Sequence, residues 1–264
     1  METMVKEYDE NGYALLEGVF SGAEVDALVA ASADVSGADS PQRIFERDGA
    51  LVRAVYGVHL LNRTLDALTR DARMVEPARA MLRSDVYIHQ TQLNPKAPFE
   101  GDVWEWHQDF LYWNRDDGMP GPRVLSAALY LDDVTEFNGP LFLIPGSQHS
   151  DLESETSTYA EGWEKAAQGF RHRIRPETLA RLMDRHGLVS TRARRGSVLV
   201  FDGRLLHCSP PNLSASVRTV LFIRYNAVDN ALQPVPAPRP EWVASRNPTP
   251  VAPLDRPFLD ALRG

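Results

Sequence analysis

The stretch Trp104-Glu-Trp-His-Gln-Asp-Phe110 carries an imidazole and a carboxylate, His107 and Asp109, inside an aromatic run. On an extended strand successive side chains alternate between faces, so these two would point the same way with Cα atoms roughly 6.6 Å apart. Residues two apart on a helix do not share a face. Both side chains could therefore reach one metal ion. A His-x-Asp pair is common, however, as a surface ion pair or around a core histidine, so a metal site requires a third ligand.

His207 is the candidate third ligand. It follows a predicted strand over 197–201 and the turn residues Asp202-Gly203. Two imidazoles and one carboxylate form the 2-His-1-carboxylate triad, which holds Fe(II) on one face and leaves other coordination positions open. The sequence therefore predicts an iron centre made of His107, Asp109 and His207. The alternative for His207 is a core histidine that caps a turn.

Arg218 follows a turn-like segment, Pro210-Pro-Asn-Leu-Ser214, and begins another apolar stretch. The chain can double back there and place Arg218 on the strand next to His207. A guanidinium grips a carboxylate with two parallel hydrogen bonds, as a dicarboxylate co-substrate chelating the iron at its other end would require. Ser209 or Ser214 could add a hydroxyl group. The alternative for Arg218 is a surface ion pair.

The fold class follows from many short apolar stretches separated by turn residues. Strands are expected at 12–20, 51–57, 86–94, 124–131, 141–144, 197–201 and 216–222. Asn138-Gly139 is the pair favoured by a tight hairpin, and it lies between two of these strands. Short strands at this spacing predict an antiparallel barrel or a double-sheet jelly roll, mainly β with flanking helices.

Helix signals are fewer. Ser21-Gly-Ala-Glu24 fits a capping box, and Asn62 is a plausible cap for the helical turns that follow it. The glycines and prolines of the segment 111–123 predict a loop, which would carry Trp113 and Arg123 beside the metal.

Strand 86–94 has an unusual distribution of polar residues. Alternation places three amides on one face, Gln90, Gln92 and Asn94, and three other residues on the opposite face, Tyr87, His89 and Leu93. A buried amide without a partner costs about 1 to 3 kcal/mol, so three on one face need partners or water. They would line a polar cavity or an ordinary solvated sheet face.

Composition bounds the remaining possibilities. The chain has 264 residues, of which 43% are hydrophobic and 24% charged, and this is typical of a globular protein. Its net charge of -8 disfavours nucleic acid and anionic membranes as partners. The single cysteine, Cys208, excludes an internal disulfide, and the charged N-terminal residues do not resemble a secretory signal, so a cytoplasmic location is expected.

One domain over residues 1–264 is expected at this length. Residues 149–190 are polar and helix-prone and include a predicted helix over 176–186, so they would form a helical insertion that acts as a lid or a spacer. The tail over 233–264 is rich in proline and should run extended over the surface.

Several motifs together resemble one family, and they cover most of the chain. They are Asn11-Gly-Tyr13, Tyr87-Ile-His-Gln90, Trp106-His-Gln-Asp-Phe110, Asp117-Gly-Met-Pro120, Phe137-Asn-Gly-Pro140, Ile144-Pro-Gly-Ser147 and His207-Cys-Ser209 with Arg218. The chain resembles the phytanoyl-CoA dioxygenase-like family of Fe(II)/2-oxoglutarate oxygenases, in particular the bacterial free amino acid hydroxylases of the ectoine and leucine hydroxylase kind. It departs from the family at Asn11, where an aspartate is frequent.

The resemblance implies a double-stranded β-helix, a cupin-like jelly roll, with iron held by the predicted triad. It implies 2-oxoglutarate bound by Arg218, with Ser209, Gln90 and Asn94 contributing, and O2 as the second co-substrate, with ascorbate as a stimulant. The expected reaction is hydroxylation of an unactivated C-H bond of a free amino acid, with a leucine-like side chain favoured, in specialised metabolite biosynthesis. The carboxylate at Asp109 favours hydroxylation over halogenation, since related halogenases have a small residue there.

The substrate side is less defined by the sequence. Five residues are candidates for gripping the substrate: Arg53, Tyr56, His59, Trp113 and Arg123. A zwitterion needs a cation for its carboxylate and an acceptor for its ammonium group, for which Asp116 is available. Two alternatives remain open. One is the same chemistry on a substrate tethered to a carrier protein or coenzyme A, or on a polyketide or peptide intermediate. The other is a cupin-like metal-binding protein without redox chemistry.

Overall fold

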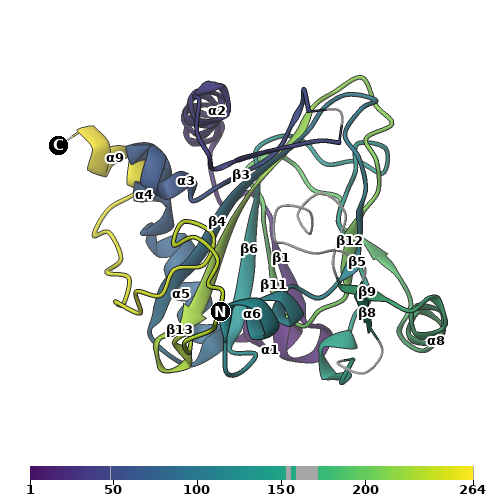
Figure 1. The fold of residues 1–264 in the computed structure, drawn as a ribbon. Coiled ribbons are helices and arrows are strands. Elements are labelled where there is room, and N and C mark those ends of the chain that lie inside the picture. The colour runs from purple at the N-terminus through teal and green to yellow at the C-terminus, as the bar shows by residue number, and fades with distance from the viewer. Residues whose placement is uncertain (48, 153–155, 159–171, 264) are drawn as a thin grey trace.

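The computed structural model describes residues 1–47, 49–152, 156–158 and 172–263. Two antiparallel sheets face each other (Figure 1). The larger has seven strands in the order β1-β11-β6-β13-β4-β3-β2. Their bounds, in that order, are Tyr13–Leu16, Val198–Asp202, Val124–Tyr130, Arg218–Ala227, Val86–Lys96, Val52–Tyr56 and Arg43–Phe45.

The smaller sheet has the order β10-β7-β12-β5, with bounds Val189–Ser190, Phe142–Leu143, His207–Ser209 and Trp104–His107. A further pair joins β8 (Thr156–Thr158) to β9 (His172–Ile174). The prediction of a mainly β, double-sheet jelly roll is confirmed. The Asn138-Gly139 pair does not form a tight hairpin, because the strands on either side of it, β6 and β7, lie in different sheets.

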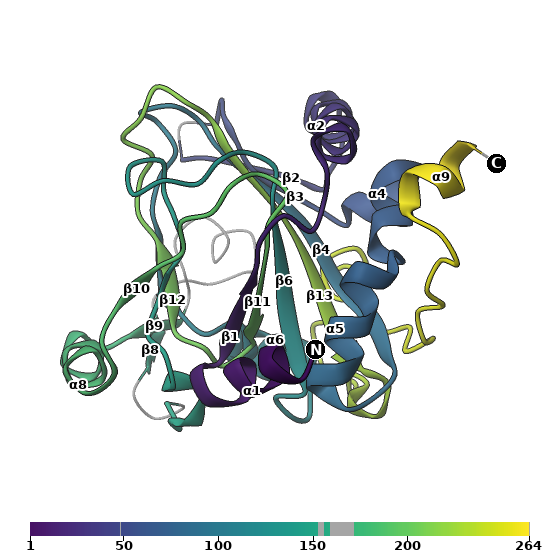
Figure 2. The same cartoon turned by 180° about the vertical axis from the view of Figure 1, so that it is seen from behind.

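Helices cover the face of the larger sheet that points away from the smaller one (Figures 1 and 2). They are α1 (Glu2–Asn11), α2 (Gly22–Gly37), α3 (Val58–Leu61), α4 (Arg63–Thr69), α5 (Ala72–Leu82) and α9 (Phe258–Arg263). The main hydrophobic core lies between these helices and the sheet, and a second cluster around Phe201 and Leu143 fills one end of the space between the sheets. Central strands such as β11 are buried on both faces, which explains the continuous run Val198-Leu-Val-Phe201.

Local signals predicted the helix starts well. Ser21 and Glu24 form the predicted capping box at α2, and Asn62 accepts from the backbone N–H groups of Thr64 and Leu65 at the start of α4. The predicted helix over 176–186 is α8 (Pro176–His186), with proline in its first turn. Whether the insertion acts as a lid depends on residues 153–155 and 159–171, which lie outside the described ranges.

Two other predictions were wrong. The segment 111–123 is not a loop throughout, because α6 (Asp109–Asp117) occupies most of it and ends at Gly118, whose φ is 78°. The tail beyond Gln233 has no regular structure before α9, as predicted, but it is not confined to the surface. Val243 and Ala244 are fully buried, and Arg239 lines the central pocket.

Gly196 supports a prediction about stability. Its φ is +84°, and a Cβ there would lie 2.3 Å from the backbone oxygen of Phe20. Gly196→Ala should therefore lower the free energy of unfolding by at least about 2 kcal/mol, because both the left-handed backbone and the contact are unfavourable for alanine. Gly22, at the start of α2, has open space around it, so Gly22→Ala should be neutral or slightly stabilising. Urea unfolding of both variants measures this, and equal effects would contradict it.

Candidate metal centre and central pocket

The two candidate imidazoles lie on paired strands. In the antiparallel ladder of β12 and β5, His207 is directly opposite His107, and the ring centroids are 4.1 Å apart. The carboxylate of Asp109 completes the group, with one ligand atom from each residue within 4.8 Å of the others. These three residues could hold one metal ion, and all are buried.

Asp109 reaches this point in a different way from that predicted. Strand β5 ends at His107, and Asp109 is the first residue of α6. An acidic residue in the first turn of a helix is stabilised by the helix dipole, which favours this local structure. The two side chains converge because the chain turns at Gln108, not because they share one face of a strand.

Hydrogen bonds determine which imidazole nitrogen is available to a metal. Nδ1 of His107 lies 2.6 Å from the backbone oxygen of Glu105, and Nδ1 of His207 lies 2.9 Å from that of Leu205. A carbonyl oxygen can only accept, so each Nδ1 carries the proton and donates it. With the proton on Nδ1, each Nε2 carries a lone pair directed at the metal position, which is the tautomer that a metal requires. Burial, and then the neighbouring His107, lower the pKa of His207 to about 3, so this ring stays neutral.

Asp109 is held as a carboxylate. Burial opposes its charge, but the guanidinium of Arg224 and the two imidazoles outweigh burial and bring its pKa below the usual range. Its Oδ2 accepts a hydrogen bond from Ser126 Oγ at 3.1 Å and lies 3.7 Å from Arg224 Nε. Its Oδ1 lies 3.6 Å from His107 Nε2. Two imidazoles and one carboxylate fit the donor set of a non-haem Fe(II) centre.

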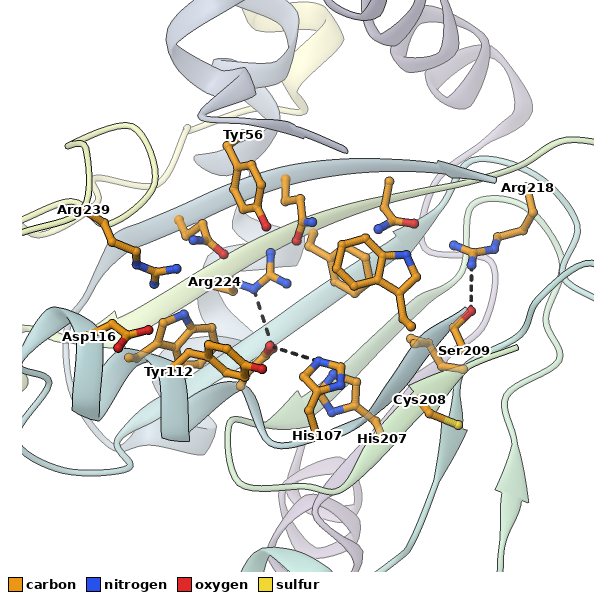
Figure 3. A pocket seen from close by; sticks show the side chains of 18 residues that line it. Tyr56, His107, Tyr112, Asp116, His207, Cys208, Ser209, Arg218, Arg224 and Arg239 are labelled. Atoms are coloured by element: carbon orange, nitrogen blue, oxygen red, sulfur yellow. Dashed lines mark hydrogen bonds and ion pairs between the residues drawn. The ribbon is translucent and has the colours of Figure 1, made fainter. Parts of the chain in front are cut away.

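The triad lies at the middle of a pocket between the two sheets. Figure 3 shows Arg218 and Ser209 on one side of the triad, and Arg239, Asp116 and Tyr112 on the other. The pocket therefore has two ends with different chemistry, and any ion bound by the triad is accessible from both.

Arg218 and Ser209 form the first end. Arg218 is buried, and its Nη2 donates to Ser209 Oγ at 3.0 Å. Its Nε has no hydrogen-bond partner, and no carboxylate of the described residues lies within ion-pair distance of it. Burial lowers the pKa of Arg218 to about 10, which still leaves it charged at neutral pH. A buried cation without a counter-ion is an anion-binding site.

The position of Arg218 corrects one prediction. Its strand, β13, belongs to the larger sheet and pairs with β4 and β6, whereas His207 is on β12 of the smaller sheet. Arg218 reaches Ser209 across the space between the sheets. Of the two predicted hydroxyls, Ser209 contacts Arg218, whereas Ser214 donates to Asn212 in the turn.

The three amides predicted to share a face all line the pocket. Gln92 and Asn94 lie opposite Phe222 and Val220 of β13. Gln92 Nε2 and Asn94 Oδ1 are buried and have no hydrogen-bond partner among the described residues. Gln90 donates to the backbone oxygen of Val243 in the tail. The alternative of a solvated sheet face is excluded, since all three are buried.

His89 departs from the predicted alternation. The register between β13 and β4 shifts after Arg224, which leaves His89 as the extra residue of a bulge. Its ring lies 5.3 Å from that of Trp113, a pocket residue, and its Nε2 lies 3.6 Å from Asp117. A bulge changes the direction of one side chain, and nothing in the residues around His89 predicts it.

The second end of the pocket combines charged and aromatic side chains. Arg239, from the tail, donates from Nε and Nη2 to the two oxygens of buried Asp117. Asp116 lines the pocket beside it, and Tyr112 and Trp113 come from the same helix, α6. This end offers a cation, a carboxylate and an apolar wall.

Of the five predicted substrate contacts, Tyr56 and Trp113 line the pocket and three do not. Arg53 is buried in an ion pair with Glu46 at 2.8 Å and packs over the ring of Trp104 at 4.0 Å, so it supports a pocket residue from behind. His59 Nδ1 lies 2.8 Å from Thr91 Oγ1, outside the lining. Arg123 pairs with Asp229 at the surface, and the prediction that it lies beside the metal was wrong.

Sequence reasoning missed several pocket residues, above all Arg224 and Arg239. Arg224 could have been found, because it lies six residues after Arg218 on one strand and alternation puts both on the same face. Nothing in the proline-rich tail identified Arg239. Cys208, next to His207, points its sulfur away from the triad (Figure 3), and burial raises its pKa to about 12, so it is an unreactive thiol.

Comparison with known proteins agrees with this geometry. The family model for phytanoyl-CoA dioxygenase (PhyH) matches residues 8–220. The ectoine dioxygenase of Bordetella bronchiseptica is 36% identical over 263 residues, covering 95% of this chain and 84% of that protein. The L-proline trans-4-hydroxylase of Streptomyces griseoviridis is 34% identical over 256 residues, covering 94% of each. The chain belongs to the phytanoyl-CoA dioxygenase family.

Solved structures give the same result. The crystal structure of EctD from S. alaskensis with 2-oxoglutarate and 5-hydroxyectoine matches with a TM-score of 0.85 and 32% identity, covering 98% of this chain and 88% of that one. The carbocyclase SnoK from nogalamycin biosynthesis has a TM-score of 0.72 at 21% identity, which supports the fold alone. Among the helices of the described residues, none has the length and apolar character needed to span a bilayer.

The triad supports a prediction about metal affinity. His207→Ala removes one of the three candidate ligands, so the affinity for Fe(II) or Co(II) should fall by at least about 100-fold. Mutation of a residue that merely hydrogen-bonds to a metal ligand already lowers metal affinity by about 10- to 100-fold. The exposed His149→Ala is the matched control and should bind metal normally. Anaerobic metal titration measures both, and undiminished binding by His207→Ala would exclude this triad as the metal site.

His89 supports a prediction about pH. Burial lowers its pKa to about 4, although Asp117 acts against burial. In the unfolded chain the pKa of His89 is about 6.5, so the unfolded state binds the proton more tightly than the folded state. The folded state is therefore most favoured above pH ~6.5, where His89 is neutral in both states. This stability is lost as the pH falls toward 4, because protonation of His89 favours the unfolded chain. Relative to His89→Gln, the protein should lose roughly 2 to 3 kcal/mol of unfolding free energy between about pH 7 and pH 4. Urea unfolding across this range measures the difference, and parallel pH profiles would contradict it.

Proposed function

We propose that this protein is an Fe(II)- and 2-oxoglutarate-dependent dioxygenase that hydroxylates a small, free, amino-acid-like substrate. The observation that carries the proposal is the buried His107, Asp109 and His207 triad at the middle of a pocket with an unpaired guanidinium at one end. The named activities of the two relatives, on ectoine and on L-proline, support the same class of substrate.

The Arg218 end suits 2-oxoglutarate. The distal carboxylate would receive hydrogen bonds from Arg218 and Ser209, and Asn94 lies nearby on the same pocket face with a free polar atom. A dicarboxylate with a keto group can hold this anion site with one end and the metal with the other. Gln90 is committed to the backbone of Val243, so its predicted contact with the co-substrate is less direct.

The opposite end suits a zwitterion. Arg239 is fixed by two hydrogen bonds to Asp117 and still has Nη1 available for a substrate carboxylate. Asp116 lines this end and would accept hydrogen bonds from a substrate ammonium group, and the rings of Tyr112 and Trp113 would cover the carbon skeleton. A preorganised grip of this kind orients one C-H bond toward the metal.

When bound, the iron and 2-oxoglutarate would supply the oxidation: O2 is consumed, one oxygen atom enters the substrate C-H bond, and the other enters succinate as CO2 is released. The chain's own residues would bind and orient the reactants. Asp109 keeps its negative charge on the metal, and the two Nδ1–H bonds to backbone oxygens hold both imidazoles in place. The aromatic residues around the triad, Trp104, Tyr112, Trp113 and Phe222, exclude water.

The finer expectations from the sequence stay predictions. A leucine-like substrate would rest its side chain on the aromatic wall, and a role in specialised metabolite biosynthesis follows from the resemblance alone. A carrier-tethered or coenzyme A-linked substrate remains an alternative in which the same chemistry acts on a longer molecule.

A substrate panel tests the function. The protein, loaded anaerobically with Fe(II), is mixed with 2-oxoglutarate, O2 and each of the common amino acids or ectoine, and succinate and the oxygenated product are measured. At least one small zwitterion should raise succinate formation with matching product, and Arg218→Met should abolish both by weakening 2-oxoglutarate binding. If no free compound stimulates turnover but a carrier-bound one does, the free-substrate proposal is wrong. If 2-oxoglutarate does not bind the metal-loaded protein, the oxygenase proposal itself is wrong.

A further inference from the structure

Arg224 is a second buried arginine in the pocket, and the reaction as proposed gives it no contact with the substrate or with 2-oxoglutarate. It lies on β13, and Figure 3 shows its guanidinium between the triad and Arg239, on the substrate side. Only 6% of the residue is exposed. Neither Nε nor Nη1 has a hydrogen-bond partner within the described residues. A buried guanidinium with two unsatisfied nitrogens is costly unless something else binds it.

Asp109 is the nearest carboxylate but cannot satisfy Arg224 once a metal is bound. Its Oδ2 is 3.7 Å from Arg224 Nε, too long for a hydrogen bond, and already accepts from Ser126. When Asp109 binds a divalent metal, its single negative charge is more than offset by that metal. Arg224 then faces a positive centre instead of a counter-ion, so the electrostatic need for another anion increases.

The other neighbours of Arg224 leave that need unmet. The guanidinium carbon lies 4.8 Å from the ring centroid of Phe222 and 5.9 Å from that of Trp113. Aromatic faces attract a cation but accept no strong hydrogen bond along its edge. Behind the pocket wall, Asp117 on α6 binds Arg239 through both oxygens. The ion pair of Arg224 among the described residues is the 3.7 Å contact with Asp109. No described residue therefore accepts a hydrogen bond from Arg224 Nε or Nη1, and a ligand in the pocket can supply that acceptor.

From these contacts we infer that Arg224 binds a second carboxylate on the substrate, so that the substrate is an acidic amino acid of the aspartate or glutamate class. This inference rests on the proposed function and narrows it. Arg239 takes the α-carboxylate and Arg224 takes the side-chain carboxylate, which holds the intervening carbon chain on the substrate side of the triad. A leucine-like side chain in that place would leave Arg224 buried without an acceptor, and a site built to bind a polar group rejects an analogue that lacks it.

The test compares acidic substrates with neutral ones of similar shape. With Fe(II) and saturating 2-oxoglutarate, kcat/KM should be at least about tenfold higher for glutamate or aspartate than for glutamine, asparagine or leucine. Arg224→Met keeps the length of the side chain but removes its charge. It should reduce kcat/KM for the acidic substrate by about 100-fold, mainly through KM, and reduce the preference over leucine, because the substrate's second carboxylate would lose its charged partner.

Binding without turnover provides a second measurement. Calorimetry on the zinc-loaded protein with 2-oxoglutarate should show that Arg224→Met weakens the binding of the acidic amino acid and leaves 2-oxoglutarate binding within about twofold. Arg224→Lys retains the charge and should recover part of the affinity. It also serves as the second variant if Arg224→Met is not folded, as judged by thermal unfolding. Arg239→Met is the matched comparison and should weaken acidic and neutral amino acids alike.

Three outcomes would overturn the inference while leaving the proposed function intact. The first is preferential turnover of leucine or another neutral amino acid by the unmodified protein. The second is a loss of 2-oxoglutarate affinity in Arg224→Met without a change in substrate preference, which would make the co-substrate the partner of Arg224. The third is a loss of metal affinity alone, which would assign Arg224 to the support of Asp109. Absence of turnover with every free compound contradicts the proposed function instead.

Discussion

The backbone pairing of β12 with β5 is the constraint on which the site depends. It places His207 opposite His107 with the rings 4.1 Å apart, although the two residues are remote in sequence. The same backbone supplies the oxygens of Glu105 and Leu205 that fix the orientation of both rings. Because the two imidazoles are held by a sheet and the carboxylate by the first turn of a helix, the three ligands converge without requiring the chain to move.

Buried charge organises the rest of the pocket. Three arginines line it, and each is compensated differently. Among the described residues, Arg239 has the two oxygens of Asp117, Arg224 has the distant Oδ2 of Asp109 and two aromatic rings, and Arg218 has a hydroxyl group. Guanidinium groups that are left partly unsatisfied in this way define where anions bind, and the triad separates the Arg218 end from the other two. The two ends of the pocket therefore differ in their charged groups before any ligand binds.

The sequence predicted the ligand triad, Arg218, Ser209 and the amide-lined face of β4, because each rests on residue chemistry and on the period of a strand. Prediction from the sequence failed where the backbone changes from strand to helix within a few residues. Asp109 begins a helix directly after a strand, and that helix replaced the predicted loop and carried Trp113 into the pocket. The predictions for Arg53 and Arg123 were wrong because Arg53 pairs with Glu46 and Arg123 pairs with Asp229. In the sequence, an arginine in an ion pair cannot be told from one that binds a substrate.

The sequence by itself determined the fold class and the candidate metal ligands, because short apolar strands separated by turns and a His-x-Asp pair with a later histidine are patterns of residue type and spacing. Only the tertiary structure decided which sheet carries each group. Arg218 acts across the gap between the sheets, and Arg239 enters from a tail whose composition predicts an extended surface segment. Such contacts depend on how segments distant in the sequence pack together. A buried charged side chain needs a charged partner or a ligand nearby, and the local sequence does not show which distant residue will be that partner.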